Sequence, residues 1–309
     1  MRLTVAIPFR NAADTLRDAI RSVVAQSFED WELLLVDDGS DDDSLILARG
    51  VRDARVAVFA DGRRLGLTAR LNQIAGLARG EYLARMDADD LMHPDRLRRQ
   101  VEALDAERSI DVMGTATYAM DAAGVVHGVR GPTAAGTSPA AVVAHGLFIH
   151  PTVTGRTAWF RRHPYDWRFV RAEDRELWCR TVAVSRFAPI AEPLHFYREG
   201  GTGALTKYIE SCRMDRAIYR RYGPASAGWP WTARRLAASH LKEAAYCVAA
   251  WAGREADLLS LRNAPLSERQ RADAGRALAV IRSTPVAGWD EQGEPHGRIH
   301  DADQVGRFG

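Results

Sequence analysis

The chain has 309 residues, and its 42 Lys and Arg against 40 Asp and Glu give a formal net charge of only +2. This balance excludes a general nucleic-acid binder, which needs a basic excess over a whole face. Hydrophobic residues make up 46% of the chain and charged residues 27%, so a packed core forms without disulfide or metal staples. The length suits one large α/β domain with an appendage, or two domains.

The cysteines are few and widely spaced. Cys179, Cys212 and Cys247 form neither a CxxC pair nor a zinc-binding pattern, so we expect three free thiols in a reducing compartment. An apolar strand pattern already begins at residue 3, and no run of 18 apolar residues follows anywhere. We therefore expect neither a signal peptide nor a membrane span, and a cytoplasmic location.

The first half of the chain alternates between strand and helix patterns. Pro8 ends the first strand, and residues 31–36 form the continuous apolar run of a strand buried on both faces. Strands that alternate with helices predict βαβ units, hence an α/β fold with a mostly parallel central sheet flanked by helices. The predicted strands are 3–8, 31–36, 56–59, 81–86 and 110–118, and the predicted helices are 16–24, 43–52, 68–79 and 94–107.

The second half has a different texture. We expect a loop at 124–138, a helix at 173–184 and short strands at 187–190 and 194–198. Beyond about residue 206, Ala- and Arg-rich helical segments are interrupted at Pro224, Pro230 and Pro265, and the last twenty residues read as a loose tail. The predicted organisation is one domain over 1–205, with halves 1–118 and 119–205, and a helical extension over 206–309.

Acidic residues follow two of the apolar strands. Asp37 and Asp38 come after one strand, and Asp87, Asp89 and Asp90 come after another. In open α/β sheets ligands bind at the carboxyl ends of the strands, so the two clusters would meet in one crevice. Three adjacent carboxylates repel, and Mg²⁺ or Mn²⁺ bound with phosphate oxygens would relieve the repulsion. The pattern predicts a metal–diphosphate site; a solvated acidic turn is the alternative.

Several motifs in a fixed order cover about residues 3–100. They occupy residues 5–11, 25–28, 31–40, 66–72, 80–83 and 86–90, with Pro94 downstream. In order and spacing they resemble the family 2 glycosyltransferases. The resemblance implies the GT-A fold, a divalent metal (Mn²⁺ or Mg²⁺), and inverting transfer from a nucleoside diphosphate sugar, a UDP-sugar first among them.

The resemblance also implies roles for individual residues. Pro8 and Asp38 would hold the nucleobase end, and Arg70 and Asn72 would lie near the base or the diphosphate. Asp87 and Asp89 would serve the ribose and the metal, and Asp90 would face the sugar or the metal shell. Arg10 stands where an aromatic residue is usual, although a guanidinium plane also stacks on a base. The full implied nucleotide-sugar-binding set is Pro8, Phe9, Arg10, Asn11, Asp38, Gly39, Arg70, Asn72, Asp87, Ala88, Asp90, His150 and Arg198.

An inverting transferase needs a general base that accepts the proton of the acceptor hydroxyl. Glu173 and Asp174 resemble the Glu-Asp motif that opens a helix in this family. We expect Asp174 to be the base, with Glu173 as the second candidate. The alternative is a structural role, because carboxylates also stabilise helix N-termini.

Three further positions follow from the resemblance. His150 lies in a segment expected on the acceptor side, although a lone His is more often structural. Arg198 ends a late strand and could neutralise diphosphate charge. Many relatives carry a His two residues beyond this Arg, where the chain has Gly200, and His195 is the candidate substitute.

The acceptor is expected to be a saccharide or a lipid-linked molecule, in polysaccharide, glycolipid or glycoconjugate synthesis. Basic pairs and tryptophans in the second half are either ordinary solvated charge and packing or a peripheral contact with the inner face of the membrane. Other classes are a sugar nucleotidyltransferase, which should carry a Gly-rich loop after its first strand, and a non-catalytic nucleotide-sugar-binding or scaffold protein. The pairs and tryptophans are Arg161-Arg162, Arg220-Arg221, Arg234-Arg235, Trp229, Trp231 and Trp251.

Overall fold

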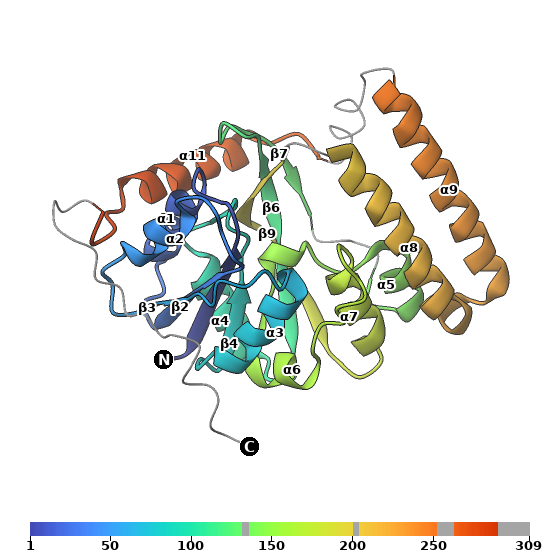
Figure 1. The fold of residues 1–309 in the computed structure, drawn as a ribbon. Helices are drawn as coiled ribbons and strands as arrows, with labels where there is room; N and C mark the ends of the chain where they lie inside the picture. The colour runs from blue at the N-terminus through green and yellow to red at the C-terminus, as the bar shows by residue number, and fades with distance from the viewer. Residues whose placement is uncertain (132–135, 200–203, 252–262, 290–309) are drawn as a thin grey trace.

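The computed structural model describes residues 1–131, 136–199, 204–251 and 263–289. Helices and strands alternate along the first half, as the sequence predicts (Figure 1). The strands are β1 (Leu3–Phe9), β2 (Trp31–Asp37), β3 (Val56–Phe59), β4 (Tyr82–Arg85), β5 (Leu91–Met92), β6 (Val112–Met120), β7 (Val126–Arg130), β8 (Thr154–Arg156) and β9 (Phe187–Arg198). The helices are α1 (Leu16–Val24), α2 (Ser44–Arg49), α3 (Leu67–Leu77), α4 (Arg96–Ala106), α5 (Pro139–His145), the 3-10 turn η1 (His150–Thr152), α6 (Thr157–Arg162), α7 (Glu173–Thr181), α8 (Ala204–Ala227), α9 (Trp229–Trp251) and α11 (Glu268–Ser283).

All of the strands in the described ranges belong to one sheet. Its order is β3-β2-β1-β4-β8-β6-β9-β5, with β7 paired to β6. Strands β1 to β4 run parallel, so their carboxyl ends share one edge. The second half is mixed, because β8 runs antiparallel to β4 and β6 while β6 and β9 are parallel. The predicted α/β class with a central sheet flanked by helices is confirmed.

Two hydrophobic cores cover the two faces of this sheet. Alternate side chains of β1 point to opposite faces, so Val5 and Ile7 pack with α1, whereas Ala6 packs with Leu71 and Ile74 of α3. Figure 1 shows α1, α2 and α11 on one side of the sheet and α3 and α6 on the other. This double cover explains why the strands of the first half read as continuous apolar runs.

The structure corrects three expectations in the second half. The predicted loop at 124–138 contains β7, which pairs with β6. The two short strands predicted at 187–190 and 194–198 form one strand, β9, because register shifts in its pairing with β6 accommodate Pro193 within the sheet. Pro224 does not interrupt a helix, since α8 continues past it to Ala227. The next residue, Gly228, has a φ of 83° and terminates the helix.

The helices after residue 203 pack at two separate places on the domain. Helices α8 and α9 pack side by side, and α8 also packs on α5 and α7. Helix α11 instead packs against α1, and its Ala277 and Ile281 join Tyr118 and Phe196 in a third cluster. The predicted loose tail falls at 290–309, outside the described residues. No helix in the described ranges has the length and apolarity needed to cross a bilayer.

A buried polar chain joins α4 to β4 and β9. Arg96 Nη1 lies 3.0 Å from His195 Nδ1, and His195 Nε2 lies 2.9 Å from Asp90 Oδ2. Because the guanidinium only donates, Nδ1 accepts and the proton of the neutral ring sits on Nε2, which donates to Asp90. Burial and the positive charges of Arg96 and Arg85 hold the pKa of His195 well below its usual value. The imidazole therefore stays neutral at neutral pH.

We predict that His195→Ala lowers the free energy of unfolding by about 3 kcal/mol, because it removes two buried hydrogen bonds to charged groups. Urea denaturation of the two proteins measures the difference. His127→Ala, which removes a half-exposed imidazole, is the control and should change stability by less than about 0.5 kcal/mol. Equal effects of the two substitutions would contradict a supporting role for the buried chain.

Candidate active site

The nucleobase end of the predicted site is built at the carboxyl ends of β1 and β2. Asp38 Oδ1 accepts from the backbone N–H groups of Leu65 (2.7 Å) and Gly66 (3.0 Å) and from Arg70 Nε (3.0 Å). Its other oxygen accepts from Gly66 at 3.0 Å. The carboxylate thus fixes the loop before α3, so any role in reading a base would be shared with this structural one.

Arg70 and Asn72 hold the protein itself. Arg70 is almost fully buried and makes a two-pronged ion pair with Asp61, at 3.0 and 2.7 Å. The amide of Asn72 donates to the carbonyl of Tyr165 at 3.0 Å and accepts from its N–H at 2.8 Å. Both side chains are therefore positioning groups, and a direct contact of either with a base or diphosphate stays a prediction.

The other residues expected around the base differ in exposure. The Phe9 side chain packs in the core, Pro8 is buried in β1, and Arg10 is exposed. Asn11 adopts a φ of 49°, and its side-chain oxygen accepts from the N–H of Asp41 at 3.0 Å. Gly39 has a φ of 70°, which favours glycine at this turn. Arg10 is thus the member of this set with a side chain open to solvent and able to stack on a base.

The acids after β4 form one cluster. Asp87, Asp89 and Asp90 each place a carboxylate oxygen within 4.8 Å of the others. Asp89 is exposed, Asp87 is half-buried, and Asp90 is fully buried. Ala88, which separates Asp87 from Asp89 in the sequence, is also buried. Asp90 uses Oδ1 to accept from the N–H of Arg198 at 2.8 Å and Oδ2 to accept from His195. Asp90 therefore does not open toward a sugar.

The chemistry of this cluster fits a hard divalent cation. Loss of hydration and repulsion from Asp87 raise the pKa of Asp89, and burial with repulsion from Asp87 and Asp89 raises that of Asp90 well above its usual value. A cation beside Asp87 and Asp89 would relieve this repulsion and leave further coordination sites for phosphate oxygens. The exposed Asp89 is the member most accessible to it.

Arg198 supports the cluster from β9. Its Nε donates to the carbonyl of Asp89 at 2.8 Å, and its Nη1 donates to that of Ala122 at 2.8 Å. The guanidinium therefore fixes the turn that carries Asp89. His195 is fully buried between Arg96 and Asp90, so the suggestion that it reaches a phosphate or metal is wrong. Gly200 lies outside the described residues.

The predicted base lies in a second cluster at the start of α7. Ligand atoms of His150, Glu173 and Asp174 also lie within 4.8 Å of one another. Burial would raise the pKa of Glu173, but the hydrogen bond and charge of His150 outweigh it and leave that pKa lowered. The pKa of Asp174 is raised, chiefly by burial and further by the charge of Glu173, while His150 opposes the shift. A raised pKa suits a general base.

Arg85 connects the two clusters. It is buried at the end of β4 and forms hydrogen bonds with Asp87. The negative charges of Asp87, Glu173 and Asp90 all raise the pKa of Arg85, and its own charge in turn opposes protonation of Asp174. One guanidinium therefore balances acids that are nearly ninety positions apart in sequence.

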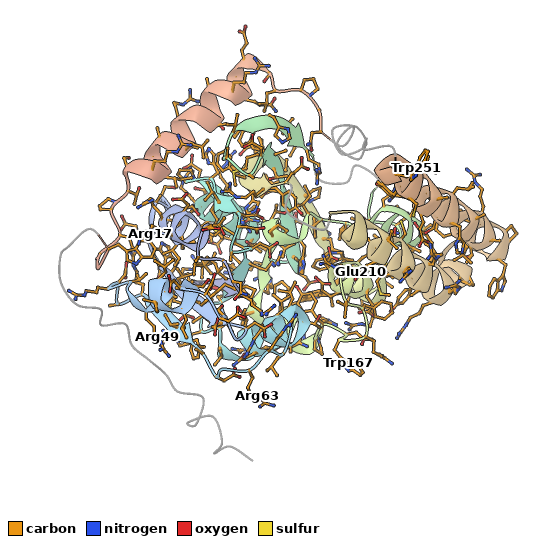
Figure 2. The ribbon with its side chains drawn as sticks, turned by 45° about the horizontal axis from the view of Figure 1, so that its top comes forward. Arg17, Arg49, Arg63, Trp167, Glu210 and Trp251 are labelled. Carbon is orange, nitrogen blue, oxygen red and sulfur yellow. The ribbon has the colours of Figure 1, made fainter. Side chains whose placement is uncertain are left out.

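A pocket of about 410 Å³ opens beside Glu173. Gly66 and Thr68 line it from the start of α3, and Trp167 and Arg171 line it from the loop before α7. The Trp167 side chain is largely exposed and lies on the same side of the molecule as Arg63 (Figure 2). The pocket thus joins the loop held by Asp38 to the helix that carries the predicted base.

The sequence reasoning missed Arg85 and Tyr165. The hydroxyl of Tyr165 lies 3.0 Å from His150 Nε2, so it helps to orient the second cluster. Arg85 carried a usable signal, since a charged residue in a strand buried on both faces needs a buried partner. Tyr165 carried none, because its partners come from distant segments.

Comparison with known proteins gives the family. The model of "Glycosyl transferase family 2" matches residues 4–167. The chain is 33% identical over 229 residues to the putative glycosyltransferase EpsE of Bacillus subtilis. The aligned region covers 71% of this chain and 76% of EpsE. The chain is 27% identical over 189 residues to the uncharacterized glycosyltransferase MJ1057 of Methanocaldococcus jannaschii, covering 59% of this chain and 65% of that protein.

Solved structures give the fold. The mannosyltransferase PcManGT from Pyrobaculum calidifontis, in complex with GDP-Man and Mn²⁺, has a TM-score of 0.56 at 16% identity, covering 94% of this chain and 88% of that one. S. aureus TarS 1-349, in complex with UDP-GlcNAc, has a TM-score of 0.55 at 17% identity, covering 92% and 82%. These likenesses confirm the GT-A type of the sheet and its flanking helices. Because the family model spans over half of the chain and EpsE matches most of it, the chain belongs to glycosyl transferase family 2 and is a glycosyltransferase.

Proposed function

We propose that this glycosyltransferase moves a sugar from a nucleoside diphosphate sugar to an acceptor hydroxyl, with inversion at the anomeric carbon. The observation that carries the proposal is the pair of acidic clusters around Arg85. One cluster suits a metal and a diphosphate, and the other offers a carboxylate with a raised pKa. Inversion requires both groups on opposite sides of one reacting carbon.

The chain's residues would divide the work as follows. Asp174 accepts the proton of the acceptor hydroxyl, whose oxygen then bonds to the anomeric carbon. The bond from that carbon to the diphosphate breaks on the opposite face, and the diphosphate leaves with the electron pair. Asp87 and Asp89 would hold a divalent cation, Mn²⁺ or Mg²⁺, which when bound would supply positive charge next to the leaving diphosphate. Arg85 would hold Asp87 in place for this task through their hydrogen bonds.

Solved structures of the same fold support the proposed donor class. TarS has been solved with UDP and with UDP-GlcNAc, and PcManGT with GDP-Man and Mn²⁺. We propose a UDP-sugar as the first candidate donor. A further relative, 39% identical over 104 residues, is the succinoglycan biosynthesis protein ExoO of Rhizobium meliloti, which favours a polysaccharide or glycoconjugate acceptor for this chain as well.

The direct test is incubation of the full chain with a panel of nucleotide sugars, with Mn²⁺, Mg²⁺ or a chelator. Release of nucleoside diphosphate that depends on the metal supports the proposal. Formation of a sugar phosphate and a nucleoside triphosphate when pyrophosphate is added would indicate a nucleotidyltransferase instead. Thermal stabilisation by a donor without turnover on any acceptor would indicate a binding protein.

We predict that Asp89→Ala lowers kcat by about 10² to 10³-fold, because the leaving diphosphate loses its electrostatic stabilisation. The reaction is followed by nucleoside diphosphate release under saturating donor and metal. Asp14→Ala removes an equally exposed aspartate from a turn outside the site and should leave kcat unchanged. Full activity of the Asp89 variant with metal present would refute the metal assignment.

We predict that Asp174→Asn lowers kcat by about 10² to 10⁴-fold while donor affinity stays near that of the parent, because only proton transfer is lost. Isothermal titration with the donor and initial rates separate the two effects. Glu173→Gln is the matched variant. A larger loss of kcat in the Glu173 variant than in the Asp174 variant would move the base to Glu173.

We predict that His150→Gln moves the acidic limb of the kcat/KM profile to higher pH. His150 lowers the pKa of Asp174, so without it the base stays protonated, and inactive, up to a higher pH. The pH dependence of kcat/KM under subsaturating donor measures the limb. A limb that stays in place, or moves to lower pH, would show that His150 does not act on the base.

A further inference from the structure

A second pocket lies outside the catalytic clusters. It has a volume of about 340 Å³ and is enclosed by α5, α7, α8 and α9. Polar side chains dominate its lining, and most of them are basic. They are His145, Arg175, Asp215, Arg235, Ser239 and Lys242.

The positive charge in this pocket exceeds the negative charge. Arg175 forms an ion pair with Asp215, the one acid in the lining. Arg235 and Lys242 have no carboxylate partner within the described part of the chain, and Arg235 Nη2 instead lies 3.4 Å from His145 Nε2. Arg175 Nε is buried without a hydrogen-bond partner there. A pocket with two unbalanced cations and spare N–H donors suits a phosphate group.

The whole α8–α9 hairpin shares this excess. Residues 204–251 contain eight Lys and Arg against three Asp and Glu, a formal charge of +5 in a chain whose total is +2. Each of the three acids is paired with an arginine. Glu210 pairs with Arg171 at 2.7 Å, Glu243 with Arg216 at 2.6 Å, and Asp215 with Arg175. The uncompensated charge therefore sits on the remaining basic side chains.

Large apolar side chains are exposed on α9, the helix that carries Arg235 and Lys242. Successive residues of a helix are about 100° apart, so Leu241 and Val248 form a stripe about 100° round α9 from the one formed by Arg235 and Lys242. Leu241 is 72% exposed, Val248 65% and Trp251 90%. Figure 2 shows Trp251 at the end of α9, away from the sheet. Exposed apolar residues mixed with unpaired basic ones are typical of an interfacial helix.

We propose that this surface docks on an anionic lipid bilayer, with a lipid phosphate in the pocket and with Leu241 and Val248 among the headgroups. A second copy of the chain is disfavoured, because it would bring two positive hairpins together. Two members of the other basic pairs already have partners elsewhere. Arg161 donates to the carbonyls of Ala75 and Ala78, and Arg221 faces Asp166. Docking does not depend on the transfer chemistry, although the pocket shares α7 with the predicted base.

The test is co-sedimentation of the full chain with phosphatidylcholine vesicles, with and without phosphatidylglycerol, at low and high salt. We expect binding to vesicles with phosphatidylglycerol, weakened by salt. The double variant Arg235→Ala/Lys242→Ala should lower the partition coefficient by at least about tenfold. Arg269→Ala/Arg271→Ala removes the same charge from exposed positions of α11 and should bind nearly as well as the parent.

A second set of variants tests the apolar contact: Leu241→Ser/Val248→Ser on α9, with Val280→Ser on α11 as its control. We expect the double variant to lose binding and the control to retain it, while both keep the donor turnover of the parent. Equal losses in pocket and control variants would overturn the proposal, as would parent binding that ignores phosphatidylglycerol. Thermal stabilisation by inorganic phosphate without vesicle binding would assign the pocket to a free anion. A dimer broken by the apolar substitutions, without vesicle binding, would assign the surface to a second copy.

Discussion

Buried guanidinium groups neutralise the acids that gather at one edge of the sheet, and the site depends on this balance. Three carboxylates in four positions after β4 would repel one another strongly. Arg85 pairs with Asp87, and Arg96 acts through the neutral His195 on Asp90. Asp89 has an exposed carboxylate that no guanidinium contacts among the residues that the structure describes. The protein thus stabilises two of the three acids itself and leaves one for a ligand.

The same principle operates at the carboxyl end of β2. Asp38 accepts from two backbone N–H groups and from Arg70, which is itself paired with Asp61. A buried carboxylate is stable only when its oxygens are satisfied, and here they order the loop before α3. Acidic side chains at this edge of the sheet therefore have two uses: some order loops of the protein, and others are available to bind ligands. Sequence motifs alone do not distinguish these two uses.

Much of the first half could be predicted from the sequence, because its strands are buried on both faces and its turns follow them directly. The clustering of Asp87, Asp89 and Asp90 followed from their adjacency after one strand, and the sheet places that strand, β4, next to β1. The second half was harder. Strand β9 crosses two prolines, and β7 has a mixed burial pattern with no clear alternation. Partners such as Arg85 with Glu173, or Asn72 with Tyr165, join distant segments, so local patterns carry no trace of them.

The clamp between Asn72 and Tyr165 spans the two halves of the chain. The amide of Asn72 forms hydrogen bonds with the main chain of residue 165, through its N–H and its carbonyl. This grip places no demand on the identity of the side chain there or on its neighbours in the loop before α7. A loop held by its backbone is free to change its exposed surface without losing its position. Exchange of the exposed part of that loop between relatives, with Asn72 kept for the backbone and Tyr165 kept for His150, would therefore leave the loop in position.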